Sequence, residues 1–127
     1  MPAIVKSTLL DPRYPNGIYV DLDVLRKSRE IKRLLSEGPE VLDIMEGRGE
    51  ITLGPFEYDT IILLMDYISY YDDQNLIPGS VMDWEIEYVN EMLVKDFIKF
   101  ADLARVLKVD TAINLADFYA GLFMNIH

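Results

Sequence analysis

Acidic side chains are the groups of this chain best suited to chemistry, because closely spaced carboxylates can hold a hard metal ion. They gather at Asp72-Asp73 and at Asp83, Glu85 and Glu87. A calcium loop combines oxygen ligands at alternate positions with a glycine and a terminal glutamate. Neither cluster has this layout. We therefore interpret both clusters as solvated acidic loops and expect no metal site.

Groups for nucleophilic catalysis and for phosphate binding are not arranged for either task. The one histidine, His127, is at the end of the sequence, where residues are rarely held in a fixed geometry. No serine or threonine can therefore be placed beside an imidazole that would activate it. Gly47-Arg48-Gly49 lacks the further glycine and the strand-to-helix setting of a phosphate loop. The sequence predicts a protein that is not an enzyme, with no catalytic residue and no cofactor.

The composition is that of one soluble domain. The 127 residues fit a single domain spanning 1–127, and 50% of them are hydrophobic, which is enough for a core. The net charge of −10 argues against a nucleic-acid partner and fits either a basic partner or an acidic solvated surface. There is no cysteine, which excludes disulfides and thiolate metal sites. No apolar run is long enough to cross a membrane, and the N-terminus lacks the apolar core of a signal peptide.

The elements that would position a functional surface begin with strands. We expect strands at 3–10 and 18–22, joined through Asn16-Gly17, which can supply a positive φ for a tight reversal. Ser28 is a candidate cap for a helix that ends at Gly38-Pro39. A third strand is expected at 50–53, before a helix that starts near Asp59. The helix buries one face, made of Ile61, Leu64, Met65 and Ile68.

The last third, residues 82–126, carries the strongest apolar patterns. Trp84 is expected in an acidic turn, as a structural clamp rather than a partner contact. Helices follow at 91–107, with an apolar stripe that includes Leu93 and Phe97, and at 111–126. The second of these is unusually rich in large apolar residues at helical spacing: Leu115, Phe118, Tyr119, Leu122 and Phe123. This order of elements predicts an α+β fold with a small three-stranded sheet flanked by helices, and the last helix suggests a surface for a partner.

Several segments in the same order resemble one family. They are 17–23 (Gly-Ile-Tyr-Val-Asp-Leu-Asp), 27–35 with its Ser-x-x-Ile-Lys core, Ile51-Thr52-Leu53 with the helix 61–71, Ile77-Pro78, Trp84-Glu85-x-Glu87-Tyr88, and 97–112 with Leu107-Lys108-Val109. Together they resemble the Skp family, the small adaptor of Skp–cullin–F-box ubiquitin ligases. That family shares the BTB/POZ fold with elongin C, whose ending this chain also resembles.

The resemblance implies a non-catalytic adaptor of the cytoplasm and nucleus that bridges a cullin to an F-box or BC-box-type receptor. Under this reading the candidate cullin-binding residues are Ile44, Met45, Arg105 and Val106. Arg105-Val106 stands where the family has an Asn-Tyr pair. The candidate residues for binding the receptor helix are Leu115, Phe118, Tyr119, Leu122 and Phe123. An amphipathic helix would lie in a groove with anchors at i, i+3 and i+4.

A different class of function remains open beside the adaptor. BTB-type domains also act as self-associating modules, and an apolar helix without a partner favours a homodimer that binds no cullin. Neither reading involves a nucleic acid or a membrane.

Overall fold

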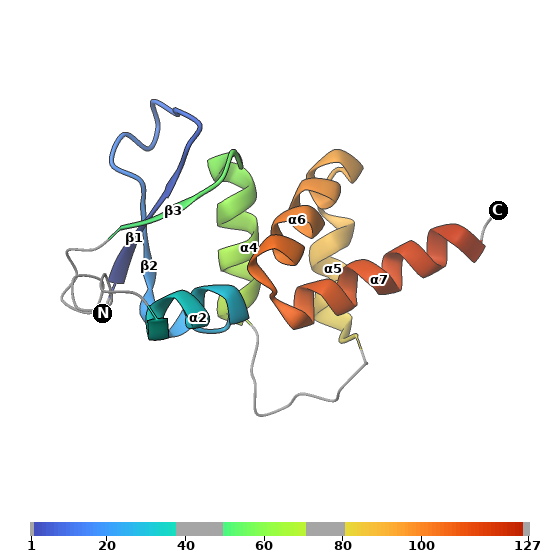
Figure 1. The fold of residues 1–127 in the computed structure, drawn as a ribbon. Helices are drawn as coiled ribbons and strands as arrows, with labels where there is room; N and C mark the ends of the chain where they lie inside the picture. Colours follow the sequence, from blue (N-terminus) through green and yellow to red (C-terminus); the bar gives the residue numbers. More distant parts are fainter. Residues whose placement is uncertain (1, 38–49, 71–80, 126–127) are drawn as a thin grey trace.

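The computed structural model describes residues 2–37, 50–70 and 81–125, and these form an α+β fold with a small sheet and a larger helical part (Figure 1). In chain order the elements are β1 (Pro2–Ser7), β2 (Ile18–Asp21), α1 (Leu22–Leu25), α2 (Arg29–Glu37), β3 (Glu50–Leu53), α4 (Tyr58–Tyr70), α5 (Asp83–Asn90), α6 (Val94–Leu107) and α7 (Asp110–Asn125).

The sheet has the strand order β2-β1-β3, with β1 antiparallel to β2 and parallel to β3. The predicted hairpin is therefore confirmed, and its reversal ends at Gly17 with a φ of 81°. A Cβ atom on Gly17 would lie 2.6 Å from the Val5 carbonyl oxygen, so no larger residue fits without a backbone shift. This close approach fixes where β2 begins.

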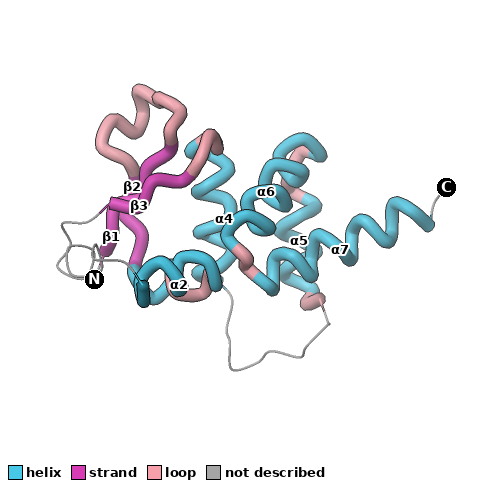
Figure 2. Tube along the Cα trace, viewed as in Figure 1, coloured by secondary structure: helices cyan, strands magenta, loops and turns pink. Residues whose placement is uncertain are grey.

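Helix α4 lies between the sheet and α6, so that one helix serves the packing of both halves (Figure 2). The predicted inward face is confirmed, because Ile61, Leu64, Met65 and Ile68 are all buried. Tyr67 of the same helix is fully buried and its ring packs edge-on against Phe100 of α6, with 5.4 Å between ring centroids. The core is thus continuous from the sheet to the C-terminal helices.

A second link between the two halves is made at the start of α2. The predicted cap is confirmed, since the Ser28 hydroxyl oxygen accepts a hydrogen bond from the Ile31 N–H at 3.1 Å. The same hydroxyl donates to the Leu107 carbonyl at the end of α6. Arg29 and Asp110 form an exposed ion pair of 2.8 Å beside it. The start of α2 is therefore attached to the turn between α6 and α7.

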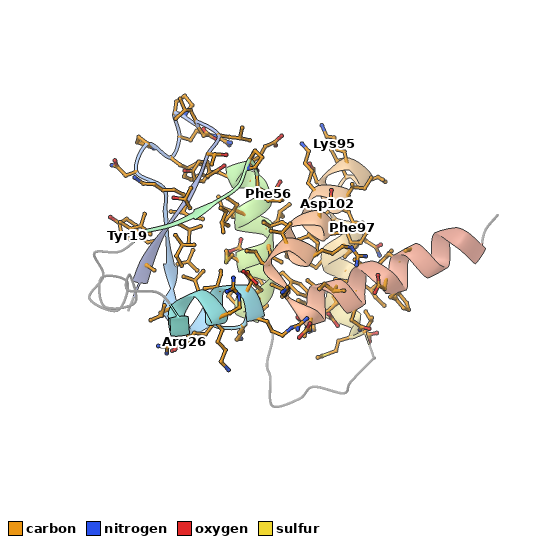
Figure 3. All side chains as sticks on the ribbon, viewed as in Figure 1. Tyr19, Arg26, Phe56, Lys95, Phe97 and Asp102 are labelled. Atoms are coloured by element: carbon orange, nitrogen blue, oxygen red, sulfur yellow. The ribbon has the colours of Figure 1, made fainter. Side chains whose placement is uncertain are left out.

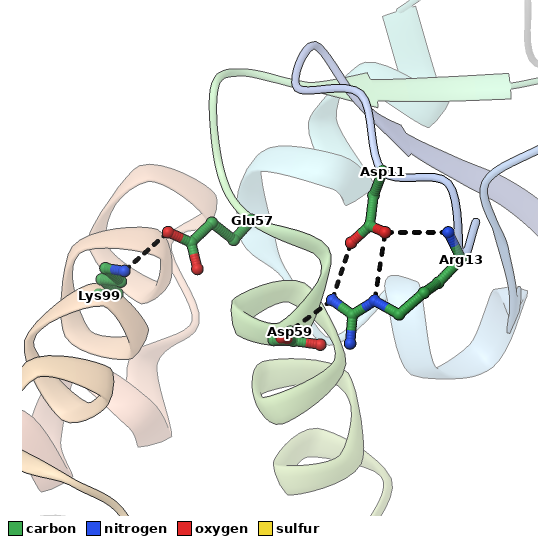
Figure 4. A network of polar contacts seen from close by, with 5 residues as sticks. All are labelled: Asp11, Arg13, Glu57, Asp59 and Lys99. Carbon is green, nitrogen blue, oxygen red and sulfur yellow. Dashed lines mark hydrogen bonds and ion pairs between the residues drawn. The ribbon is translucent and has the colours of Figure 1, made fainter. Parts of the chain in front are cut away.

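Exposed ion pairs near the start of α4 connect this region to the loop between β1 and β2 and to α6 (Figure 4). The Arg13 guanidinium contacts Asp11 at 2.8 Å and Asp59 of α4 at 3.1 Å. The Lys99 ammonium of α6 contacts Glu57 at 2.7 Å. Hydrogen bonds from Arg13 lower the pKa of the Asp11 carboxyl. Because these pairs face solvent, they contribute little to stability and mainly orient the connected segments relative to one another.

The segment around Trp84 differs from the prediction. Residues 82–87 were expected to form an acidic turn, but Asp83 begins helix α5. The Glu85 carboxylate accepts a hydrogen bond from the Met82 N–H at 2.7 Å, and Asp83 and Glu85 place negative charge in the first helical turn. The acidic residues thus start a helix. The next helix begins at Val94 rather than at 91, and Leu93 is exposed instead of part of the apolar stripe.

Candidate partner-binding surface

An open apolar groove of about 370 Å³ runs between α6 and α7. Its walls are mostly aliphatic and aromatic, with two charged side chains among them. The lining residues are Val94, Phe97, Ile98, Ala101, Asp102, Arg105, Ala116 and Ala120.

Helix α6 has two apolar faces, and only one of them is used by the core. The core face consists of Phe100, Leu103, Ala104 and Leu107, all buried. The other face carries Val94 and Ile98 one turn apart, and these are 66% and 54% exposed. These two aliphatic side chains therefore face solvent on the same strip of the helix. The groove is therefore a surface that a further element can cover.

Helix α7 contributes small side chains to the groove. Ala116 is buried beneath it and Ala120 lies one turn further along. Beside them, a Cβ atom built on Gly121 would meet nothing within 4 Å. Small side chains leave the groove open and allow another helix to approach the backbone closely. The part of α7 from Ala116 to Gly121 therefore leaves space at the groove for side chains of another element.

Aromatic rings support the groove from beneath. Phe97 packs against Tyr119 of α7, with 5.5 Å between ring centroids, and against Phe100, with 6.2 Å. The Tyr119 hydroxyl donates to the Ile86 carbonyl of α5 at 3.3 Å. Burial raises the pKa of the Tyr119 phenol above its ordinary value. A smaller hollow of about 160 Å³ shares Phe97 and Val94 with the groove.

One ion pair joins the two helices at the groove. The Arg105 guanidinium contacts the Asp117 carboxylate of α7 at 2.8 Å, and both side chains are at least half exposed. A pair so exposed contributes little to stability. It holds α6 and α7 in register and keeps a charged group beside an otherwise apolar groove.

The predicted receptor-binding residues occupy different environments. Leu115 is fully buried in the core, so its placement in a partner-facing set disagrees with the structure, because its side chain already packs on the protein itself. Phe118 is 40% exposed, and Tyr119 packs on the core with its edge at the smaller hollow. Leu122 and Phe123 belong to the last turns of α7, and their side chains lie outside the described residues.

The predicted cullin-binding residues are only partly described. Ile44 and Met45 lie outside the described residues. Arg105 lines the α6–α7 groove rather than a separate surface, while Val106 is exposed on α6. Arg105 is therefore part of the α6–α7 groove. Val106, the next residue in the sequence, does not line the groove.

The exposed aliphatic wall of the groove, Val94 and Ile98, was missed at the level of sequence. A signal for it exists, since Val94, Ile98 and Ala101 follow one another at spacings of four and three residues, typical of one helical face. Phe97 and Phe100 define a second, overlapping face. In the sequence, Phe97 and Phe100 define the more prominent apolar face, so the face that carries Val94 and Ile98 is less evident.

The acidic clusters do not behave as one solvated group. Glu85 is 1% exposed, so the interpretation of Asp83, Glu85 and Glu87 as a solvated loop is wrong for this residue. Its carboxylate accepts a hydrogen bond of 2.5 Å from the buried Tyr67 hydroxyl. Asp72 and Asp73 lie outside the described residues. Within 2–37, 50–70 and 81–125, no group of three or more metal-ligating side chains is placed to hold a metal ion.

Trp84 is half-buried against the core, with its ring centroid 5.4 Å from that of Tyr67, which agrees with a role as a structural clamp. In the part of the chain that the structure describes, no helix has the length and apolar character to cross a membrane. No family model matches the sequence, and no curated protein matches it.

Proposed function

We propose that this chain is a non-catalytic adaptor of the Skp type, a BTB/POZ domain that bridges a cullin to an F-box or BC-box-type receptor in the cytoplasm and nucleus. The α6–α7 groove receives an amphipathic helix of the receptor. The alternative is a self-associating BTB-type module in which a second copy covers the same groove.

The observation that carries this proposal is the exposed aliphatic wall of the groove. Val94 and Ile98 stand above a base of alanines, and the groove of about 370 Å³ takes the anchoring side chains of one helix face. Helix-in-groove recognition uses this combination of an apolar strip with a shallow depression. The order of the segments that resemble the Skp family, together with the small three-stranded sheet, supports the same reading.

Binding to receptor peptides tests the groove directly. A fluorescent F-box peptide and a BC-box peptide are each titrated with the protein, and anisotropy reports the Kd. Ile98→Glu places a charge where an apolar anchor must pack, so we expect roughly a tenfold or greater loss of affinity. Leu10→Glu is the matched control, because Leu10 is almost fully exposed in the loop between β1 and β2. It changes the charge equally and leaves affinity unchanged.

The comparison of affinities requires that both variants keep the native fold. Ile98 is more than half exposed, so Ile98→Glu retains the helical circular dichroism and the unfolding midpoint of the unmodified protein to within experimental error. Equal loss of affinity in Leu10→Glu and Ile98→Glu would contradict a role for the groove.

A pull-down with the N-terminal fragment of a cullin tests the other half of the bridge. Capture of the fragment by the protein, together with binding of either receptor peptide, supports an adaptor. Failure of the cullin fragment and of both peptides refutes it. Light scattering on the purified protein then identifies the alternative, which predicts a dimer that Ile98→Glu converts to a monomer.

A further inference from the structure

A second hollow, of about 310 Å³, lies between β2 and α4. It is on the sheet side of the molecule, away from α6 and α7, where Figure 3 shows Tyr19 apart from Phe97 and Asp102. The lining residues are Ile18, Tyr19, Val20, Asp21, Val24, Ile62, Met65, Asp66 and Ser69.

The hollow follows the backbone edge of a strand. All of β2, Ile18–Asp21, lines it. Successive side chains of a strand point to opposite faces, so a hollow bordered by every residue of the strand runs along its edge rather than over one face. The opposite wall is one face of α4, because Ile62, Asp66 and Ser69 recur at helical spacing. An edge strand and a helix therefore form the two walls of one groove.

The edge of β2 is short, with four residues that end in Asp21, but it lacks several other usual protections. In the described residues β2 pairs only with β1 and is the outermost strand of the sheet. Natural edge strands are commonly blunted by lysine, proline or a bulge. The β2 sequence Ile-Tyr-Val-Asp contains no lysine or proline, and its register with β1 is continuous from Ile18 to Asp21. This edge is suited to accept another strand.

The side chains that line the groove between β2 and α4 determine which kind of peptide strand it can accept. Val20 and Met65 are buried and Val24 is half-buried, so the interior takes aliphatic side chains. Asp21 and Asp66 are exposed, and none of the described lining residues is basic. Two cations follow α1: the Arg26 guanidinium contacts Asp23 at 3.6 Å, and the Lys27 ammonium donates a hydrogen bond to the Ile68 carbonyl of α4 at 3.2 Å.

Tyr19 adds a further feature that favours a cationic partner. It is 70% exposed and lines the groove beside Asp21. An exposed tyrosine ring attracts an ammonium or guanidinium group over its face. The net charge of −10 adds a long-range attraction for basic peptides.

We propose that an extended basic peptide binds along β2 as an added strand. Its backbone pairs with the open edge of β2, its aliphatic side chains enter the hollow against Val20 and Met65, and its lysines or arginines lie beside Asp21 and Asp66. This surface is formed by β2 and α4 rather than by the α6–α7 groove. Peptide binding along β2 therefore does not depend on whether the α6–α7 groove binds a receptor helix.

The probe is a fluorescent Lys-Val-Lys-Val-Lys-Val-Lys peptide, with Glu-Val-Glu-Val-Glu-Val-Glu as its charge-reversed counterpart. Anisotropy with the full chain measures both affinities. Asp66→Lys replaces attraction by repulsion at the groove wall, so we expect the lysine peptide to bind roughly tenfold more weakly. Glu87→Lys is the matched control, because it makes the same charge change at an exposed position of α5 that lines neither groove, and it leaves affinity nearly unchanged.

Backbone hydrogen bonding between the peptide and β2 can be tested separately from the effect of charge. Two further peptides are N-methylated either at every valine or at every lysine. Alternate residues of a strand direct their N–H groups to opposite edges, so one of these two peptides loses binding and the other retains it. Equal binding of both, equal effects of Asp66→Lys and Glu87→Lys, or tighter binding of the glutamate peptide would each overturn the proposal. So would a dimer in light scattering that Tyr19→Pro disperses, because a second copy would then occupy the edge.

Discussion

The hydrogen bond between Tyr67 and Glu85 is a buried polar contact that joins α4 to α5. Tyr67 is fully buried and Glu85 is 1% exposed, and the Tyr67 hydroxyl donates to Glu85 at 2.5 Å. The second carboxylate oxygen accepts from the Met82 N–H at 2.7 Å. One carboxyl group thus starts α5 and attaches it to α4.

Tyr67→Phe removes the hydroxyl and leaves the ring in place. A hydrogen bond to a charged group contributes about 1.5–3 kcal/mol, and a buried acceptor that loses its donor bears the desolvation cost in full. Because the phenylalanine ring keeps the packing against Phe100 and Trp84, we expect a loss close to 2 kcal/mol and no added cavity. For a chain of this size that loss lowers Tm by roughly 5–10 °C.

Urea unfolding followed by tryptophan fluorescence measures the effect, since Trp84 is the one tryptophan and its ring lies 5.4 Å from that of Tyr67. Tyr70→Phe is the control on the same helix. Tyr70 is exposed, so its loss of stability stays within about 0.5 kcal/mol. Combination with Glu85→Gln in a double-mutant cycle isolates the pair, with an expected coupling of about 1–2 kcal/mol.

A loss below about 0.5 kcal/mol for Tyr67→Phe, equal to that of Tyr70→Phe, would refute this reasoning. It would mean that the Glu85 carboxyl group is satisfied without the hydroxyl. Additive effects in the cycle would lead to the same conclusion, because the two side chains would then act independently.

Three further experiments test other parts of the structure. Leu115→Ala should lower the free energy of unfolding by about 2–5 kcal/mol, against less than about 1 kcal/mol for Phe118→Ala, because only Leu115 is fully buried; denaturant unfolding distinguishes them. Lys108→Gly should raise stability by up to about 1 kcal/mol, since Lys108 ends α6 at a φ of 54°, a left-handed conformation that glycine adopts without strain; calorimetry checks this. Arg13→Gln should return the pKa of Asp11 toward its usual value in an NMR titration. The lowered pKa makes this pair stabilising at neutral pH, and the effect is lost as pH falls through the folded-state pKa.

The N-terminal half could be predicted from sequence because its signals are local. Gly17 marks the hairpin through its positive φ, and Ser28 marks the start of α2 through its side-chain hydrogen bond. The inward face of α4 follows from apolar residues at helical spacing. Each of these features depends on neighbours within one or two turns of the chain, so the residue types alone specify them.

The groove could not be predicted to the same extent, because burial of α6 and α7 depends on distant parts of the chain. Leu115 and Phe118 are both large and apolar, and only the packing of α7 on α6 decides that the first is buried and the second is partly exposed. Glu85 resembles any solvated acidic residue until the Tyr67 hydroxyl, eighteen positions earlier, is placed beside it. Long-range partners of this kind leave no local pattern.

The most direct test of the central claim is a methyl NMR titration of the labelled protein with an F-box or BC-box helix. If the α6–α7 groove receives the helix, the methyl signals of Val94, Ile98 and Ala101 shift on binding, and that of Leu10 does not. Binding that leaves the three groove methyls unchanged, or no binding by either helix, would contradict the account.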